Sequence, residues 1–266
     1  MTATAENDPT GFTRFGAIHR AAVRAEWDAA REAGLDIAIR EDATVLFGAA
    51  PSSDSRVYNR ALGIAERPDR LPEALAFFSK HGVAGEVLLD PADVPPGVEA
   101  TIRLEAYLDH PGVVEAPQLD GLVVRPVGRE AAADWIAAII ASYEPDAATA
   151  ELWRSMARPI AANPRRLLQL AELDGKVVGA GSIQLTEAGG WMSWAGVVPA
   201  ARGRGLQRAL IAARAALAAQ AGCDWIAAWA LAGAHSSANL ARAGLRRIGE
   251  RASVRSADLV GPAPLP

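Results

Sequence analysis

Residues 197–208 read VVPAARGRGLQR, so three arginines and two glycines stand directly before a run rich in alanine and leucine. The run, residues 205–222, has apolar side chains at helical spacing and predicts a helix. Its expected buried face consists of Leu206, Leu210, Ala213 and Leu217. Pro199 lacks a backbone N–H and ends a strand, while Gly203 and Gly205 permit a tight turn. Unpaired N–H groups make a helix N-terminus attractive to negative charge, so arginines gathered there predict a bound anion.

The expected anion is a phosphate or pyrophosphate. Oriented backbone amides, the helix dipole and the side chains of Arg202, Arg204 and Arg208 would together hold it. Two familiar phosphate loops are excluded: a Walker A loop requires a lysine that is absent here, and a G-x-G-x-x-G fingerprint requires glycine where Arg208 stands. The alternative is a solvated basic helix face, but the flanking strand, proline and long helix favour the anion site.

The composition is that of an ordinary globular protein. The chain has 266 residues, 50% of them hydrophobic, and a formal net charge of -4, which argues against general nucleic-acid binding. A single cysteine, Cys223, excludes internal disulfides and a cysteine-rich metal cluster, and is expected to be structural. The N-terminal stretch lacks the pattern of a secretory signal, and no apolar run approaches the roughly 20 residues of a membrane span. We expect a cytoplasmic protein with no metal, membrane or nucleic-acid partner.

The first half of the chain predicts a small mixed domain. Residues 1–14 are expected to be a mobile leader and residues 111–121, rich in proline and glycine, a linker. Between them we expect helices at 17–34, 68–82 and 98–110, the second capped by Asp69, and strands at 37–49, 57–65 and 85–90. The expected division is a domain at 15–117, a second domain at 118–259 and a tail at 260–266.

The second half predicts a longer series of mixed elements with several consecutive antiparallel strands, joined at DG and GG pairs. Strands are expected at 122–127, 165–175, 176–186, 190–198, 224–232 and 245–254, and helices at 129–143, 148–163, 205–222 and 236–244. Because both halves end in the order strand, helix, strand, helix, strand, a tandem duplication is expected, although no residue-level repeat supports it.

The motif resembles the acyl-CoA loop of the Gcn5-related N-acetyltransferase (GNAT) superfamily, [QR]-x-x-G-x-[GA] after a V-x-P strand end. Val197-Val198-Pro199 and Arg202-Gly203-Arg204-Gly205-Leu206-Gln207 occupy those places, and Gln207 stands where glycine or alanine is usual. The resemblance covers residues 121–256. The preceding half resembles the degenerate N-terminal copy of tandem members such as the mycothiol-synthase type, and no arginine-glycine loop occurs before residue 120.

The resemblance implies two GNAT-like domains, each a twisted, mostly antiparallel mixed sheet flanked by helices, with one acyl-CoA site. It implies that backbone groups of Val197 and Val198 pair with pantetheine and that residues from Arg202 to Arg208 hold the pyrophosphate. The usual tyrosine acid, four residues before the glycine of Gly244-Leu245, is replaced by Leu240, and the usual asparagine position is Gly233. Asn239 is a candidate pantetheine contact or a plain helix-surface residue.

Acyl transfer from a thioester needs a neutral amine, so a base must take its proton. The candidates are Glu187 and Glu172 on the central hairpins and His235 in the AGAHSS loop, and each is otherwise an ordinary surface residue. Further candidates are Glu144 and Asp146 in the loop between two helices, and Ser236 and Ser237, which would cap a helix or donate to sulfur. Strand alternation places Trp191 and Trp194 on opposite faces.

These observations predict an N-acetyltransferase that moves an acetyl or other acyl group from acyl-CoA to a small-molecule amine by direct attack, as a monomer or homodimer. A non-catalytic acyl-CoA sensor or partner-binding protein, and an acyl-CoA decarboxylase or lyase, are the alternatives that remain open.

Overall fold

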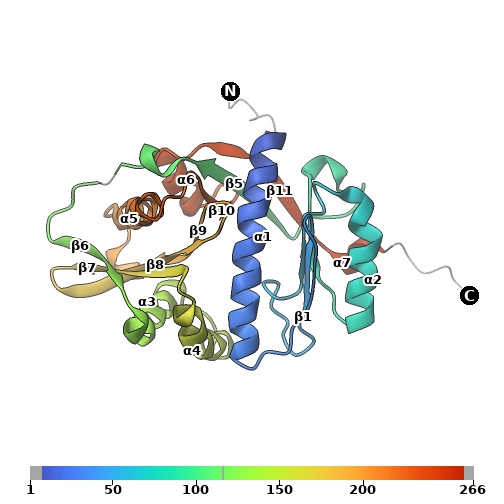
Figure 1. The fold of residues 1–266 in the computed structure, drawn as a ribbon, viewed down its shortest axis with the longest axis horizontal. Coiled ribbons are helices and arrows are strands. Elements are labelled where there is room, and N and C mark those ends of the chain that lie inside the picture. The colour runs from blue at the N-terminus through green and yellow to red at the C-terminus, as the bar shows by residue number, and fades with distance from the viewer. Residues whose placement is uncertain (1–7, 116, 261–266) are drawn as a thin grey trace, which may run out of the picture. The chain divides into compact units, whose positions relative to one another are not determined.

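The computed structural model describes residues 8–115 and 117–260 (Figure 1). The chain divides into two compact units. Unit 1 comprises residues 1–106, 229–234 and 248–266, and unit 2 comprises 107–228 and 235–247. The predicted halves, 15–117 and 118–259, were contiguous; the units are not, because the last strand of the chain pairs within unit 1. Parts of the expected leader (1–7) and tail (261–266) lie outside the described residues.

Unit 1 begins with the long helix α1 (Pro9–Glu32), which starts inside the stretch predicted to be a leader. Asp8 caps it, because a side-chain oxygen accepts from the N–H of Gly11 at 2.8 Å, and proline follows at the first helical position. Phe12 and Phe15 are buried and extend the apolar stripe of the predicted helix back toward its start. The prediction of a leader through residue 14 was therefore wrong for residues 9–14.

The strands of unit 1 are β1 (Ala38–Glu41), β2 (Leu46–Ala49), β3 (Arg60–Leu62), β4 (Glu86–Leu89) and most of β11 (Arg247–Arg255), adjacent in that order. All neighbours are antiparallel except β3 and β4. A short helix, α7 (Ser256–Leu259), follows β11. The pairing of β4 with β11, Leu89 opposite Ala252, brings the C-terminal strand into unit 1.

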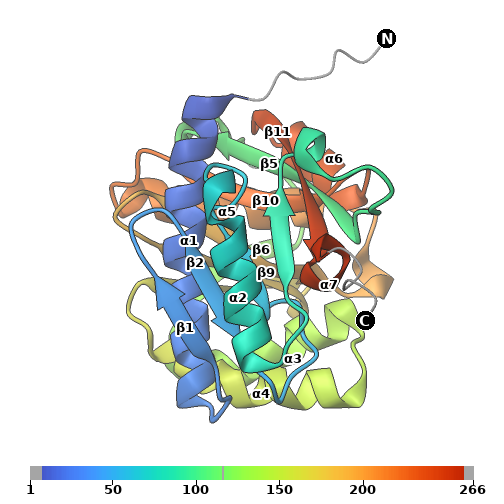
Figure 2. The ribbon, with the colours of Figure 1, turned by 90° about the vertical axis from the view of Figure 1, so that its right-hand side faces the viewer.

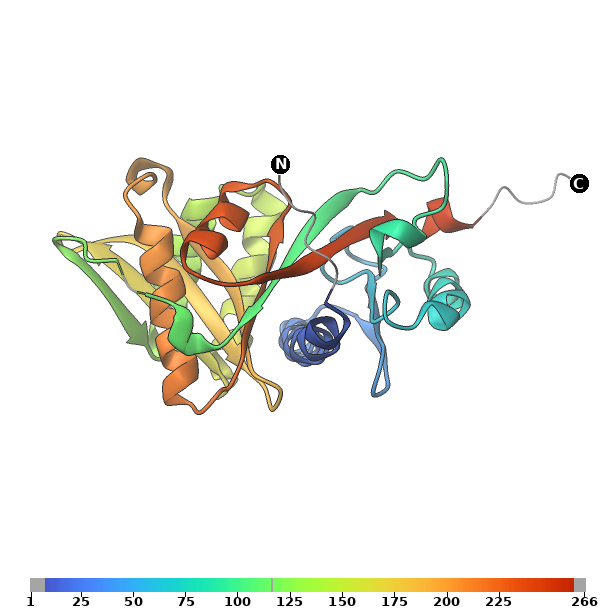
Figure 3. The same ribbon diagram turned by 90° about the horizontal axis from the view of Figure 1, so that it is seen from above.

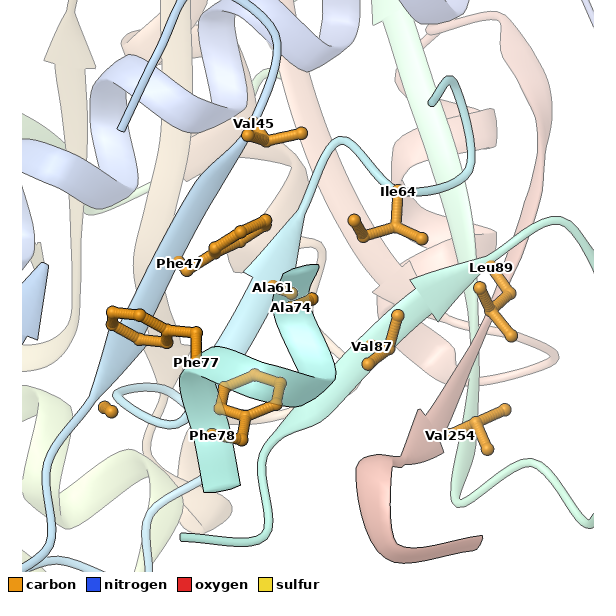
Figure 4. Packing of buried hydrophobic residues seen from close by; sticks show 11 residues of the cluster. Val45, Phe47, Ala61, Ile64, Ala74, Phe77, Phe78, Val87, Leu89 and Val254 are labelled. Carbon is orange, nitrogen blue, oxygen red and sulfur yellow. The ribbon is translucent and has the colours of Figure 1, made fainter. Parts of the chain in front are cut away.

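Two helices cover opposite faces of this sheet (Figure 2). A Cβ added at Gly48 would meet the ring of Trp27 in α1, while the neighbouring Phe47 contacts Phe77 in α2 (Leu71–His81). The α2 face holds a cluster of buried apolar side chains, shown in Figure 4: Val45, Phe47, Ala61, Ile64, Ala74, Phe77, Phe78, Val87, Leu89 and Val254. The predicted cap Asp69 instead pairs with Arg67, and α2 has no side-chain cap.

The third predicted helix, at 98–110, is a strand, β5 (Ile102–Asp109). Ile102, Leu104, Ala106 and Leu108 alternate with longer polar or aromatic residues, which is a strand period. The Thr101 N–H donates to Ser253 O, so the start of this segment pairs beside β11. The leucine- and glutamate-rich composition favoured a helix, but backbone pairing decided the structure.

Unit 2 contains β6 (Leu122–Val127), β7 (Arg166–Leu173), β8 (Lys176–Leu185), β9 (Gly190–Val197) and the start of β10 (Ile226–Leu231). Their order is β10-β9-β8-β7-β6; β10 is parallel to β9, and the others are antiparallel. The helices are α3 (Ala132–Tyr143), α4 (Ala147–Ala162), α5 (Leu206–Gln220) and α6 (His235–Arg242). The predicted mixed α/β class, with a sheet flanked by helices, is confirmed.

The two faces of β9 are covered by different helices. A Cβ added at Gly190 would meet Ala218 of α5, and one added at Gly196 would meet Ser142 of α3. Figure 3 looks down on α5, in orange, lying across the yellow strands of unit 2, with α3 and α4 behind them. The sheet of unit 2 is therefore enclosed between α5 and the α3–α4 pair.

Candidate functional site

Strand β9 has a free edge over most of its length. Its neighbours are β8 on one side and β10 on the other, but β10 pairs only at Ile226–Gly190 and Ala227–Trp191. Among the described residues, no strand pairs with that edge of β9 from Met192 onward. Free N–H and C=O groups along a strand edge can take an extended ligand as an added strand.

A bulge interrupts β9 where the free edge begins. The register with β8 shifts between Ala180 and Ser182, and Trp194 has φ of 47°, unusual for a bulky residue. The inserted residue changes the alternation of side chains along β9. Gly190 faces α5, so the next residue, Trp191, faces the α3–α4 side of the sheet. Trp194 lies on that same side, where it contacts Trp135 of α3 and Trp153 of α4. The prediction that Trp191 and Trp194 lie on opposite faces was therefore wrong, because it assumed an unbroken period of two.

The end of β9 has one backbone N–H turned away from the sheet. Val198 donates its N–H to Val178 O at 2.9 Å, so this group is used within the sheet. Val197 stands opposite Gly179 in β8. Because the next residue, Val198, makes the hydrogen bond to β8, Val197 and Gly179 form a non-hydrogen-bonded pair, in which the N–H and C=O groups of each residue point away from the partner strand. The Val197 N–H therefore faces the free edge, whereas the amide N–H of Val198, expected to pair with pantetheine, is occupied.

The loop after β9 presents a run of unpartnered backbone donors. A short 3-10 turn, Pro199–Ala201, leads to Gly203 (φ 78°) and Gly205 (φ 82°), both in the left-handed region that glycine tolerates. Gly205 is the N-cap of α5 and offers no side chain. The backbone N–H groups of residues 203–207 have no hydrogen-bond acceptor within the described part of the chain. Such an array at a helix start binds anions.

Apolar side chains pack against this loop and fix its position. Val197, Ala201, Leu206 and Leu210 belong to one buried cluster, and Leu119 from the predicted linker packs against it. A Cβ added at Gly205 would lie 3.6 Å from Leu119. The loop is thus anchored by the start of α5 and by residues of the preceding linker.

The three arginines of the loop differ in their surroundings. Arg202 donates to two backbone carbonyls, through Nη2 to Ser142 O at 2.7 Å and through Nε to Val197 O at 3.2 Å. It thereby ties the end of α3 to the end of β9. Arg204 is exposed, and Arg208 is half-buried with an Nε that has no partner among the described residues. Arg204 and Arg208 are therefore the side chains left to meet an anion, beside the half-buried Gln207.

The predicted acid and base residues are not gathered at the bulge. Glu187 is exposed in the turn between β8 and β9, and Glu172 is paired with Arg125 at 2.7 Å. Asp146 caps α4 by accepting from the Thr149 N–H at 2.8 Å, and this backbone hydrogen bond is the main cause that lowers the pKa of the carboxyl. Glu144 ends α3 with a left-handed backbone.

The predicted residues of α6 are also used in other ways. His235 is its exposed first residue, and Asn239 Oδ1 accepts from Arg242 Nη2 at 3.3 Å. Ser237 is buried and shares a 2.9 Å hydrogen bond with the Tyr107 hydroxyl, so it does not cap the helix. Leu240, at the usual tyrosine position, is buried.

Two residues near the bulge were missed. Tyr143, the last residue of α3, donates its hydroxyl to Ala195 O at 2.8 Å, and Arg214 lies buried beneath β8 and β9. Tyr143 ends a predicted helix and carried no sequence signal. Arg214 did carry one, because it follows Leu206 and Leu210 at intervals of four residues. The predicted face continued through Ala213 and Leu217 instead, and these two are only half-buried.

Comparison with known proteins identifies the domain that carries this site. Residues 132–245 match the family model described as "Acetyltransferase (GNAT) family". These residues are therefore a GNAT domain, as the loop motif predicted. They include the bulge, the free edge of β9, the arginine-glycine loop and α5. No curated protein matches the chain.

Solved structures share the fold at low sequence identity. A GCN5-related N-acetyltransferase from Kribbella flavida aligns with a TM-score of 0.58 and 16% identity, over 90% of this chain and 95% of its own. A GCN5-related N-acetyltransferase from Sphaerobacter thermophilus aligns with a TM-score of 0.58 and 17% identity, over 93% of each chain. A conserved protein of unknown function from Staphylococcus epidermidis aligns with a TM-score of 0.62 and 12% identity, over 83% of this chain and 94% of its own.

None of the helices that the structure describes is both long enough and apolar enough to cross a bilayer.

Proposed function

We propose that the protein is an N-acyltransferase that moves an acetyl or other acyl group from acyl-CoA to a small-molecule amine. The observation that carries the proposal is the continuity of two features. The free edge of β9 ends at Val197, and the loop with five unpartnered N–H groups begins six residues later, at Gly203.

The residues present fit the two ends of a CoA ester. The N–H groups of residues 203–207, with Arg204 and Arg208, match a pyrophosphate, because they supply both donors and positive charge. The outward N–H of Val197 matches an amide carbonyl of an extended arm. Arg202 contributes by holding the strand end in place through Ser142 O and Val197 O.

Acyl-CoA supplies an activated thioester, and the residues of the protein position it beside the amine. Tyr143 holds the Ala195 carbonyl, which fixes the bulge beside the free edge. Trp153 and Trp194 contact each other on the α3–α4 face, and this aromatic surface suits an amine with an apolar body. Glu172, Asp146 and Asn239 are engaged elsewhere, whereas Glu187 and His235 are exposed and stay our candidates for removing the amine proton, directly or through solvent water.

Calorimetric titration with acetyl-CoA tests the binding step, with dephospho-CoA and ATP as comparison ligands. We expect one site per chain with a dissociation constant on the order of micromolar. The absence of heat and of binding by a second method would contradict the proposal.

Release of CoA in the presence of a panel of amines tests the transfer step. An acylated amine, identified by mass, is the expected product. Binding without CoA release for any amine would indicate an acyl-CoA sensor, and a product that has lost carbon dioxide would indicate a decarboxylase.

A further inference from the structure

Arg214 is a buried cation on the inner face of α5. It follows Leu206 and Leu210 on the helix stripe that packs against the sheet, and only 3% of its surface is exposed. A charged side chain is rarely placed there unless it is paired, because removing a cation from water is costly.

No carboxylate of the described residues pairs with Arg214. Its Nε–H donates to Leu210 O, 3.0 Å away in its own helix, and the other guanidinium nitrogens have no partner in the described part of the chain. Burial lowers the pKa of Arg214 to about 10, and the Tyr143 hydroxyl is the one group that acts in the opposite direction. The guanidinium is thus neither neutralised nor fully hydrogen-bonded by the chain itself.

The side chain lies beside the bulge. A Cβ added at Gly181 would be 3.4 Å from both Cδ and Nε of Arg214 and 3.6 Å from the Cβ of Ala195. The arginine side chain therefore lies directly against Gly181, at van der Waals distance, and Ala195 is the bulge residue whose carbonyl Tyr143 holds.

A second unpartnered polar group lies on the same face of the sheet. Gln169 stands directly opposite Gly181 in the register of β7 and β8, so both point toward α5. Gln169 is 1% exposed, and its Oε1 has no hydrogen-bond partner among the described residues. Buried amides are almost always satisfied, so Gln169 adds a second incompletely hydrogen-bonded side chain to the sheet face that holds Arg214.

We infer that Arg214, with the amide of Gln169, recognises a carboxylate on the substrate. This inference rests on the proposed function. Guanidinium binds carboxylate in a bidentate way, and the amide NH₂ of Gln169 adds a donor. The carboxylate belongs either to the acyl group, as in a dicarboxylic acyl-CoA, or to an amino-acid acceptor.

The experiment has one arm for each source. In the first, calorimetry compares succinyl-CoA with butyryl-CoA, which have the same chain length but differ by the terminal carboxylate. In the second, CoA release from acetyl-CoA compares phenylalanine with phenethylamine, which differ in the same way. Each arm uses the wild type, Arg214→Met and Arg214→Lys, and Arg31→Met in α1 as a control for loss of a helical arginine.

We expect the wild type to prefer the carboxylate-bearing compound by at least about tenfold in one arm, which identifies the source. Arg214→Met should reduce that preference to less than about twofold and leave the uncharged partner unaffected, while Arg31→Met changes neither. Should Arg214→Met fail to fold, Arg214→Lys takes its place. An intermediate preference is then expected, because lysine keeps the positive charge but cannot bind a carboxylate in the bidentate way of a guanidinium.

The outcomes separate this inference from the function on which it rests. Binding of acetyl-CoA and butyryl-CoA with no preference in either arm, or a preference that survives the loss of Arg214, overturns the inference alone. If no CoA ester binds the wild type, the proposed function fails and the inference fails with it.

Discussion

The hydroxyl of Tyr143 donates to the backbone carbonyl oxygen of Ala195 at 2.8 Å. This bond joins the last residue of α3 to the bulge of β9 and occupies a carbonyl that the bulge takes out of the ladder. Tyr143 is 54% exposed, but desolvation of its hydroxyl raises its pKa, so the hydroxyl stays protonated and keeps donating near neutral pH. A surface aromatic residue thereby fixes backbone geometry at the site.

Tyr143→Phe should lower kcat/KM roughly fivefold to tenfold, because one hydrogen bond contributes about 1 kcal/mol. CoA binding should change little, since the loop is untouched. Steady-state kinetics checks this, with Tyr58→Phe in unit 1 as the control. Unchanged kinetics in Tyr143→Phe would show that the bulge is held by its backbone alone.

Gly203→Ala should weaken acyl-CoA binding in addition to its effect on stability. Gly203 and Gly222 share φ of 78°, and an added Cβ would meet nothing within 4 Å at either position. Each substitution should therefore cost about 1 kcal/mol of folding free energy from the left-handed backbone. Only Gly203→Ala should raise the dissociation constant for acetyl-CoA, as measured by calorimetry; equal affinities in the two variants would contradict the anion loop.

Arg202→Ala and Arg204→Ala should separate a structural arginine from a ligand-binding one. Loss of Arg202 leaves Ser142 O and Val197 O without their donor, so we expect unfolding free energy to fall by about 1–3 kcal/mol. Arg204 is exposed, so its loss should leave the melting temperature unchanged and weaken CoA binding most at low salt. Denaturant unfolding and titrations at two salt concentrations measure both effects, and the reverse pattern would refute the assignment.

His19 should make unit 1 sensitive to mild acid. Burial, with nearby Arg60 and Arg20, lowers its pKa well below 6.5, and Trp229 Nε1 donates to its Nδ1 at 3.3 Å. The unfolded chain therefore binds a proton that the folded chain does not, so this contribution to stability is complete above about pH 6.5 and is lost as pH falls toward the folded pKa. His19→Gln keeps an acceptor for Trp229 and should flatten the stability profile below pH 6.5. A profile parallel to the wild type would assign the acid sensitivity to other groups.

The loop was predictable because its signals are local. Glycines that need positive φ, a proline that ends a strand and the spacing of Leu206 and Leu210 all lie within a dozen residues. The assignment of β5 as a helix failed because its pairing partner, β11, lies about 150 residues later in the chain, and composition carries no trace of that pairing.

The details of the site depended on features that no single-residue pattern shows. A bulge at Trp194 moves two tryptophans to one face, and it is visible only in the register between β8 and β9. The predicted buried face of α5 included Leu206 and Leu210 but not Arg214, whose burial beside Gly181 is visible only in the packing of the helix on the sheet.

The pairing of β4 with β11 sets an order of events during synthesis. β4 ends at Leu89, and its partner Ala252 leaves the ribosome only after all of unit 2. The strands β6 to β9 are consecutive in the chain and can pair as they emerge, whereas the nascent unit 1 holds an unpaired strand edge throughout. Residues 1–117, expressed alone, would lack β11 and keep that edge exposed, so dissection of this protein at the linker would yield an aggregation-prone fragment in place of an independent domain.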